Sequence, residues 1–393
     1  MANDLNENTA KKILFFSENG DPGKKATWSN VPYCFCKALE NSGYIVVKIN
    51  LLQNKILRGV WNRAALRMIR LIFKGAEYDF SRTRIANALV NRRISKIVKK
   101  HSDATLCIFT TFSFYNKHSN IPSLLFCDWS YETLLERIGR KPYFFEKWFI
   151  KSQREVLSNA TLCVSLFPKC ADMINNQMGR EIVKWGGISA PNILDDEPFN
   201  DDEILEASSN SNIILFVGNR KYLEGAKLLV KAYNLLKESH PELELHIIGL
   251  NSSSFGLGID KSDVHFHGYL SKDIPEDCSK YYDLIRRAGV FCNPTEVWGG
   301  FSSTIEAMYY YTPVVVSPYE EFVAQFGKEI NFGQYNRKFN EKELASSIAK
   351  ILNSTTDERR SYCINAHEVV KGYHWNEYSK RLLDLLKEET ADY

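Results

Sequence analysis

Short apolar segments alternate with helix-like segments along this chain, and the alternation occurs twice. In the first half, five apolar runs have the pattern of buried strands: Lys12–Asn19, Tyr44–Leu51, Ala104–Phe112, Ile121–Ser130 and Ala160–Phe167. Helical patterns separate these runs, and the first of them stops at Gly43. Short apolar strands separated by helices predict a parallel sheet with helices on both faces.

The alternation is interrupted between Asp195 and Asn212, where the sequence is acidic and rich in serine and asparagine. Such a composition is typical of a linker or domain boundary. We therefore predict an N-terminal Rossmann-like domain (1–195), an acidic linker (196–211), a C-terminal Rossmann-like domain (212–374) and a last helix (375–393) that packs back across the domain junction. The predicted fold class is α/β, with two doubly wound domains facing a central cleft, which is the expected ligand site.

The composition argues against several other classes of protein. The net charge of +3 over 393 residues gives no reason to expect a nucleic-acid partner. Met1–Lys12 lacks the apolar region of a secretory signal, and no apolar run is long enough to span a bilayer. The nine cysteines have no CxxC or paired Cys/His spacing, so we expect reduced thiols in a cytoplasmic protein and no zinc site. The first strand is not followed by GxGxxG, the fingerprint of dinucleotide binding.

The stretch FCNPTEVWGGFSSTIEAMYYYTPVVVS, from Phe291 to Ser317, has a strand, a loop, a helix and a second strand. Gly299 and Gly300 let the loop backbone come close to a ligand. The helix begins near Ser302 or Ser303, and its free N–H groups and positive dipole end suit a pyrophosphate. This stretch is therefore the strongest candidate for a phosphate-binding site.

This stretch resembles the signature of retaining glycosyltransferases of family four, which have the GT-B fold. The likeness rests on Asn293-Pro294, Gly300-Phe301, Glu306-Ala307-Met308 and Pro313-Val314-Val315. It extends over the second half through IILFVGNRKYLEGAKLLVKAYNLL, VHFHGYL and PNILDDEPF. In the first half, the order of elements and the segment ATWSNVPYCFCKAL are similar. The resemblance thus implies the GT-B arrangement of two Rossmann-like domains.

The implied activity is a retaining, metal-independent transfer of a sugar from a nucleotide-sugar donor to a glycan or lipid-linked acceptor, in bacterial surface polysaccharide biosynthesis. Helix N-termini and basic side chains can stabilise the leaving phosphate without a metal. The chain has no D-x-D motif, so no metal or other cofactor is expected. A nucleotide-sugar epimerase and a catalytically degenerate transferase-like subunit remain open as alternatives.

The resemblance also assigns roles to individual residues. Glu296 would hold hydroxyls of the donor sugar, and Glu306 would hold the ribose. The other expected donor-binding residues are Asn219, Arg220, Lys221, Tyr269, Gly299, Gly300, Phe301, Ser302 and Ser303.

The chain departs from the family pattern in the loops that carry these roles. Trp298 stands where the first glutamate is expected, and Glu296 is the nearest acid. Glu224 replaces a lysine that precedes glycine, so phosphate contact is expected to move to Arg220 and Lys221.

The ends of the Glu306 helix allow other interpretations. Ser303 to Glu306 fits the S/T-x-x-E capping box, in which Glu306 would only bind the backbone at the start of its own helix. At the other end, Tyr311-Thr312 replaces the glycine of the family, so no left-handed glycine cap is implied.

In the first domain, Asp128 follows an apolar strand and is the candidate nearest the reacting centre. The alternative is an N-cap of the helix that begins near Ser130. Thr27, Trp28 and Ser29 lie after the first strand and are expected on the acceptor side, although Ser29 could instead cap the next helix. In the second domain, His265 and His267 alternate on a strand, where one of them can face the cleft.

The segment Lys55–Lys100 holds thirteen lysines and arginines and two acids, with apolar residues between them. This pattern indicates that the protein makes peripheral contact with anionic lipid at the inner face of the cell membrane. A lipid-linked acceptor would lie at the same face. A solvated helical face is the simpler alternative, and no RNA-reading motif accompanies the charge.

Overall fold

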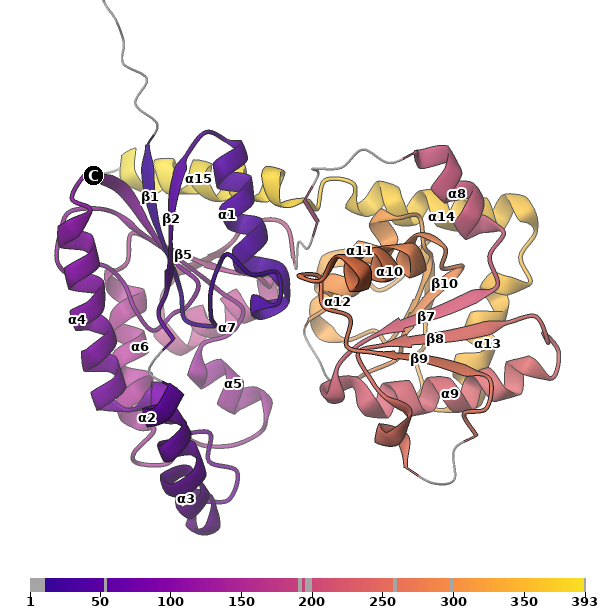
Figure 1. The fold of residues 1–393 in the computed structure, drawn as a ribbon, viewed down its shortest axis with the longest axis horizontal. Coiled ribbons are helices and arrows are strands. Elements are labelled where there is room, and N and C mark those ends of the chain that lie inside the picture. The colour runs from indigo at the N-terminus through magenta and orange to yellow at the C-terminus, as the bar shows by residue number, and fades with distance from the viewer. Residues whose placement is uncertain are drawn as a thin grey trace, which may run out of the picture. The chain divides into compact units, whose positions relative to one another are not determined.

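The computed structural model describes residues 11–52, 55–189, 193–194, 200–256, 260–296 and 300–391. The chain divides into two compact units (Figure 1). Unit 1 comprises Met1–Ile188 and Tyr378–Tyr393, and unit 2 comprises Ser189–Glu377. The division thus falls before the acidic segment that the sequence indicated as a linker.

The strands of unit 1 form one parallel sheet in the order β2-β1-β3-β4-β5-β6. They are β1 (Lys12–Ser17), β2 (Ile45–Asn50), β3 (Ala104–Phe109), β4 (Ser123–Cys127), β5 (Leu162–Ser165) and β6 (Val183–Trp185). The helices are α1 (Val31–Asn41), α2 (Lys55–Val60), α3 (Leu66–Ile72), α4 (Arg84–Lys100), α5 (Tyr131–Arg137), α6 (Lys147–Asn159), α7 (Pro168–Met178) and most of α15 (Trp375–Ala391). The predicted parallel sheet is confirmed.

Unit 2 has a second parallel sheet, in the order β12-β11-β10-β7-β8-β9. Its strands are β7 (Ile213–Val217), β8 (Glu244–Ile248), β9 (Val264–Gly268), β10 (Val290–Asn293), β11 (Val314–Val316) and β12 (Gly333–Tyr335). Its helices are α8 (Asp201–Ser209), α9 (Leu223–Lys237), α10 (Pro275–Arg286), α11 (Ser302–Tyr309), α12 (Glu320–Phe326), α13 (Glu341–Leu352) and α14 (Thr356–Val370). Helices α9 and α13 cover one face of the sheet, and α10 and α11 lie on the other (Figure 1).

The sheets contain strands, such as β1 and β7, that are apolar along most of their length. Ile13–Phe16 of β1 are fully shielded from solvent, and so are residues 214–216 of β7. A strand buried on both faces reads as a continuous apolar run, which is the signal that identified it in the sequence.

Helix α15 contributes to the core of unit 1. Tyr378 is fully buried, and its ring lies 5.9 Å from that of Phe126 on β4. Phe35 of α1 packs on the same phenylalanine, with ring centroids 5.7 Å apart. A β-carbon at Gly186 would lie 2.7 Å from the Tyr378 ring. The close approach of α15 to the backbone after β6 therefore requires glycine at this position.

The described part of the acidic segment contains a helix that the sequence did not indicate. Asp201–Ser209 form α8, whose N-cap Asn200 accepts a hydrogen bond from the Glu203 N–H. Ile204 and Leu205 are buried. Acidic residues in the first turn favour a helix because they interact with its positive dipole end.

The C-terminal end of α11 corrects an expectation from the sequence. Tyr311 has a φ of 62°, in the left-handed region, although it is not glycine. The Tyr311 N–H bonds to the Met308 carbonyl and the Thr312 N–H to the Ala307 carbonyl, as in a Schellman motif. The Tyr311 ring stacks on His367 at 4.2 Å, and its hydroxyl donates to Asp201 at 2.6 Å. These contacts offset the backbone strain, so the absence of glycine did not exclude a left-handed cap.

None of the helices within the described residues is long and apolar enough to cross a membrane.

Candidate active site

The strand order of unit 2 points to one ligand-binding position. Strands β7 and β10 lie side by side. From β7 the chain continues to β8 and β9 on one side, and from β10 it continues to β11 and β12 on the other. Open α/β sheets bind ligands outside the carboxyl ends of the strands at such a switch point. The loops that follow β7 and β10 are therefore the expected walls of the site.

These two loops contact each other closely. Gly225, in the first turn of α9, lies against Thr295, so that a β-carbon on the glycine would stand 2.4 Å from Thr295 Oγ1. The Tyr222 hydroxyl donates to the Gly300 carbonyl at 3.2 Å. Gly225 thus allows the loop after β10 to rest on the start of α9, and Tyr222 holds the end of that loop.

The basic residues predicted to bind phosphate follow β7 directly. Asn219, Arg220 and Lys221 are exposed, and Arg220 and Lys221 belong to the short 3₁₀ helix η4 (Arg220–Tyr222). The Asn219 side chain accepts a hydrogen bond from the Lys221 N–H at 2.9 Å, which shapes this turn. Two cationic side chains are therefore presented at the carboxyl edge of the sheet, beside the switch point.

The start of α11 is held by an aromatic residue. Phe301, the N-cap, is buried, and its ring packs 5.3 Å from Phe322 and 6.0 Å from Tyr319. The Phe301 side chain therefore anchors the loop. Ser302 and Ser303 are half-buried in the first turn, and the side chain of the N-cap residue makes no capping hydrogen bond. The first-turn N–H groups thus suit a bound anion.

Glu306 does not form the capping box that the sequence allowed. Its carboxylate is buried, with Lys272 Nζ 2.5 Å from Oε1 and the Tyr281 hydroxyl donating to Oε2 at 2.6 Å. Lys272 follows β9 and Tyr281 lies on α10, so the carboxylate joins three elements. Burial and the neighbouring carboxylate raise the pKa of Tyr281 well above its usual value, which keeps its hydroxyl a donor.

Lys272 is a site residue that the sequence analysis missed. Its side chain is 10% exposed, and its ammonium lies 4.2 Å from the ring centre of Tyr281. The sequence did contain a signal for this residue. The lysine comes shortly after a strand that ends at Gly268, which places it at the carboxyl edge of a sheet. Tyr269, which follows β9 as well, is 69% exposed and free to meet a flat ligand.

The loop after β10 is described in part. Glu296 is exposed, and Gly300 is half-buried. Gly299 and Trp298 lie outside the described residues. The role of Glu296 at the donor sugar stays a prediction.

In unit 1, Asp128 is not a helix cap. Its Oδ1 accepts hydrogen bonds from the Trp129 N–H at 2.9 Å and from Cys127 Sγ at 3.4 Å, whereas Ser130 caps α5. Asp128 thus lies directly after β4, at the carboxyl edge, as expected. Its role in the reaction stays a prediction.

The expected acceptor residues form an unusual turn after β1. Trp28 and Ser29 have φ angles of 41° and 53°, and Asn30 has 70°, all in the left-handed region. Thr27 is buried and donates to the Asp21 carbonyl at 2.6 Å. Ser29 does not cap α1, because Asn30 occupies the N-cap position. Strain of this kind is found mostly at functional sites.

A second missed residue, Glu18, lies at the switch point of unit 1. It directly follows β1, and its Oε2 accepts a hydrogen bond of 2.5 Å from Thr111, which lies just beyond the neighbouring strand β3. Burial raises the pKa of Glu18, while Thr111 and the charge of Arg82 oppose this rise. The signal for Glu18 in the sequence was an acidic residue near the end of the first apolar run.

The family model described as "Glycosyl transferases group 1" matches residues 199–370. This match covers less than half of the chain and lies within unit 2. The matched segment contains both loops of the switch point, α11 and the Glu306–Lys272 pair. No curated protein sequence matches this chain.

Solved structures show the same fold over the whole chain. Sucrose-phosphate synthase from Thermosynechococcus elongatus is 16% identical, with a TM-score of 0.67, covering 98% of this chain and 100% of that one. Trehalose 6-phosphate synthase from Burkholderia multivorans is 10% identical, with a TM-score of 0.62 and coverage of 98% and 99%. A mutant of S. aureus TarM, solved with UDP and sugar ligands, is 16% identical, with a TM-score of 0.55 and coverage of 77% and 59%. The predicted GT-B fold class, with two Rossmann-like α/β domains, is confirmed.

Proposed function

We propose that this protein is a retaining glycosyltransferase that moves a sugar from a nucleotide-sugar donor to a glycan or lipid-linked acceptor, as in bacterial surface polysaccharide biosynthesis. The observation that carries the proposal is the switch point of unit 2. There, the Gly225–Thr295 contact joins the loop that carries exposed Arg220 to the loop that leads into α11 and buried Glu306.

The proposed donor site uses positive groups for the diphosphate. Negative charge develops on the leaving phosphate as the glycosidic bond breaks. The Arg220 guanidinium can bind two phosphate oxygens at once, and the first N–H groups of α11 can bind another. Fixed donors of this kind supply electrostatic stabilisation without a metal ion.

Glu306 is proposed to receive the ribose. Lys272 and Tyr281 hold its two carboxylate oxygens, one partner on each oxygen. In the proposed complex a ribose hydroxyl donates to Glu306, while Lys272 balances its charge.

A panel of nucleotide sugars tests the proposal. Slow hydrolysis of one donor with release of nucleoside diphosphate is expected, and the released sugar should keep the anomeric configuration of the donor. Isomerised donor without hydrolysis would instead indicate an epimerase, and binding without turnover would indicate a degenerate subunit. Turnover should persist in EDTA, and a loss that Mg²⁺ restores would contradict metal independence.

Contact with an anionic membrane is proposed from the surface of unit 1. Helices α2 and α3 lie at one end of the unit, away from its sheet (Figure 1). The segment from α2 to α3 combines exposed apolar residues with exposed Arg63 and Arg67. The apolar residues are Ile56, Leu57, Val60, Met68, Leu71 and Ile72. An apolar strip beside basic residues suits a surface helix at a lipid interface.

Three residues of this segment are occupied by contacts within unit 1. Leu66 is buried, and Trp61 is held by its indole N–H, which donates to the Tyr78 carbonyl at 3.1 Å. Arg70 donates to the Ala76 carbonyl at 2.9 Å. These three residues support the local fold and are therefore excluded from the proposed lipid contact.

A further inference from the structure

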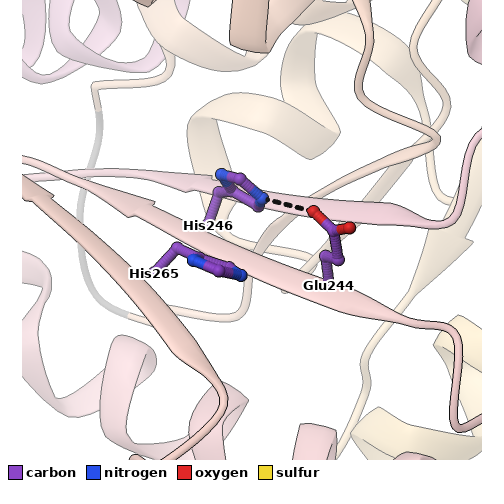
Figure 2. A group of neighbouring side chains, drawn as sticks. All are labelled: Glu244, His246 and His265. Atoms are coloured by element: carbon purple, nitrogen blue, oxygen red, sulfur yellow. Dashed lines mark hydrogen bonds and ion pairs between the residues drawn. The ribbon is translucent and has the colours of Figure 1, made fainter.

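Three side chains able to bind a metal gather at the edge of the unit 2 sheet. Glu244 and His246 lie on β8, and His265 lies on the edge strand β9, directly opposite His246 in the strand register. One ligand atom from each residue lies within 4.8 Å of the others. Figure 2 shows the two imidazoles side by side and the carboxylate turned toward His246.

The alternation of side chains along a strand explains this grouping. Leu245 and Ile247 point into the core beneath α9, so Glu244 and His246 share the opposite face. His246 is 9% exposed, whereas Glu244 and His265 are exposed. The cluster thus has one firmly held member and two with freedom to move.

We propose that Glu244, His246 and His265 bind a divalent transition-metal ion, for which Zn²⁺ is the best match. Two imidazole nitrogens and one carboxylate oxygen are ligands that zinc commonly takes, with water in a fourth position. Ligand atoms around tetrahedral zinc are about 3.3 Å apart, given metal–ligand bonds of about 2.0–2.1 Å.

The observed spacing needs only small adjustments. His246 Nε2 lies 3.0 Å from Glu244 Oε2, and the rings of His246 and His265 have centres 4.6 Å apart. The two exposed side chains can rotate to place their ligand atoms around an ion.

His267 supplies an orienting contact behind the site. Its Nε2 lies 3.0 Å from His246 Nδ1. When His246 binds metal through Nε2, its Nδ1–H can donate to His267. Such contacts fix the tautomer and ring orientation of metal-binding histidines.

The ligand types favour zinc over harder cations. Glu244 supplies the one negative charge of the ligand set. Arg287 is a cation close enough to act on Glu244, although it is paired with Asp283 at 2.5 Å, and Lys280 acts on the neighbouring His267. Ca²⁺ takes six to eight oxygen ligands, and Mg²⁺ also prefers oxygen. The cluster therefore selects for imidazole-binding metals.

The proposed ion is separate from sugar transfer. Glu244, His246 and His265 lie in the first three residues of their strands, whereas the donor-binding loops follow the carboxyl ends. An ion held here would join edge strand β9 to β8, and its expected effect is on stability.

Titration of the full chain with Zn²⁺, monitored by a competing chromophoric chelator, tests the site. Wild type should bind one ion tightly, and His265→Ala should weaken binding at least tenfold. His118→Ala, which removes an exposed histidine of unit 1, should bind as wild type does. Equal affinity in wild type and His265→Ala would overturn the proposal.

Two further measurements complete the test. Co²⁺ should give the spectrum of nitrogen and oxygen ligation, and a thiolate charge-transfer band would overturn the proposal by locating the ion at cysteine. Zn²⁺ should raise the melting temperature of wild type but not of His265→Ala, since a ligand stabilises only the state that binds it. His267→Ala should lower affinity by about 10–100-fold if it orients His246; unchanged affinity would refute that orienting role.

Discussion

The ammonium of Lys272 lies 2.5 Å from Glu306 Oε1, and both side chains are almost completely shielded from solvent. Removing one partner of a buried ion pair leaves an uncompensated charge, at a cost of about 3–5 kcal/mol. Lys272→Met should therefore lower the free energy of unfolding by that amount in urea denaturation. Adding Glu306→Gln to this variant should restore part of the loss. Strictly additive losses would contradict direct coupling.

Glu306→Gln alone tests the ribose contact. A hydrogen bond to a charged group contributes about 1.5–3 kcal/mol, so donor affinity should fall roughly tenfold or more. The measurement is calorimetric binding of the nucleoside diphosphate that the donor panel identifies. Lower stability with unchanged affinity would leave Glu306 a purely structural residue.

Arg220→Ala tests the phosphate contact. Loss of a charge-assisted bond should weaken nucleoside diphosphate binding by about 1.5–3 kcal/mol and leave nucleoside binding nearly unchanged. Lys231→Ala, on the exposed side of α9, is the matched control. If both ligands bind equally poorly to the Arg220 variant, the cause is a folding defect and not a lost phosphate contact.

Gly225→Ala tests the contact between the two loops. The added methyl group would meet Thr295, and overpacking of this kind costs about 1–3 kcal/mol. Both melting temperature and donor affinity should fall, because the loop after β10 has to move. Gly59→Ala, in helix α2 with open space around it, should be neutral or slightly stabilising. A fully stable Gly225→Ala variant with normal affinity would rule out a role for this contact.

The raised pKa of Glu18 predicts that the stability of the protein depends on pH. The pKa of Glu18 is raised in the folded state, so folding favours the protonated form. The stabilisation is complete below the unfolded-state pKa and is lost as pH rises through the folded-state pKa. Glu18→Gln should therefore be more stable than wild type at pH 7 and lose this advantage near pH 4. A difference independent of pH, in thermal denaturation over this range, would exclude titration of Glu18 as the cause.

Charge reversal tests the membrane surface of unit 1. Wild type should bind vesicles containing phosphatidylserine, with affinity falling as salt rises. Each basic residue near the lipid contributes about 1 kcal/mol, so Arg63→Glu with Arg67→Glu should weaken binding about thirtyfold or more. Lys342→Glu with Lys350→Glu, on α13 of unit 2, is the control pair. Wild type that ignores such vesicles at low salt would favour a soluble acceptor.

The sheets could be predicted from the sequence because burial on both faces produces continuous apolar runs, as in β1 and β7. The loop after β10 was identified through its glycines and through Glu306. Lys272 could not be identified as the partner of Glu306, because the two are 34 residues apart and meet only through the packing of α10 and α11. Thr111 and Glu18, 93 residues apart, meet because β1 and β3 are neighbours. Local periodicity reports which residues are buried, and strand order decides which loops meet.

The left-handed Tyr311 was missed for a related reason. Side chains other than glycine rarely adopt this conformation, so the sequence argued against it. Stacking on His367 and the hydrogen bond to Asp201 come from α14 and α8, which are distant in the sequence. Tertiary contacts thus outweighed a local preference.

Tyr378 completes the core of unit 1 although it follows the whole of unit 2 along the chain. A ribosome must therefore make unit 2 before the segment that covers Phe126 leaves the exit tunnel. During that interval the first sheet would expose an apolar surface on β4, which is a natural target for chaperones. A stop codon before Tyr378 would leave unit 2 nearly intact. It would damage unit 1, although most of unit 1 is translated first.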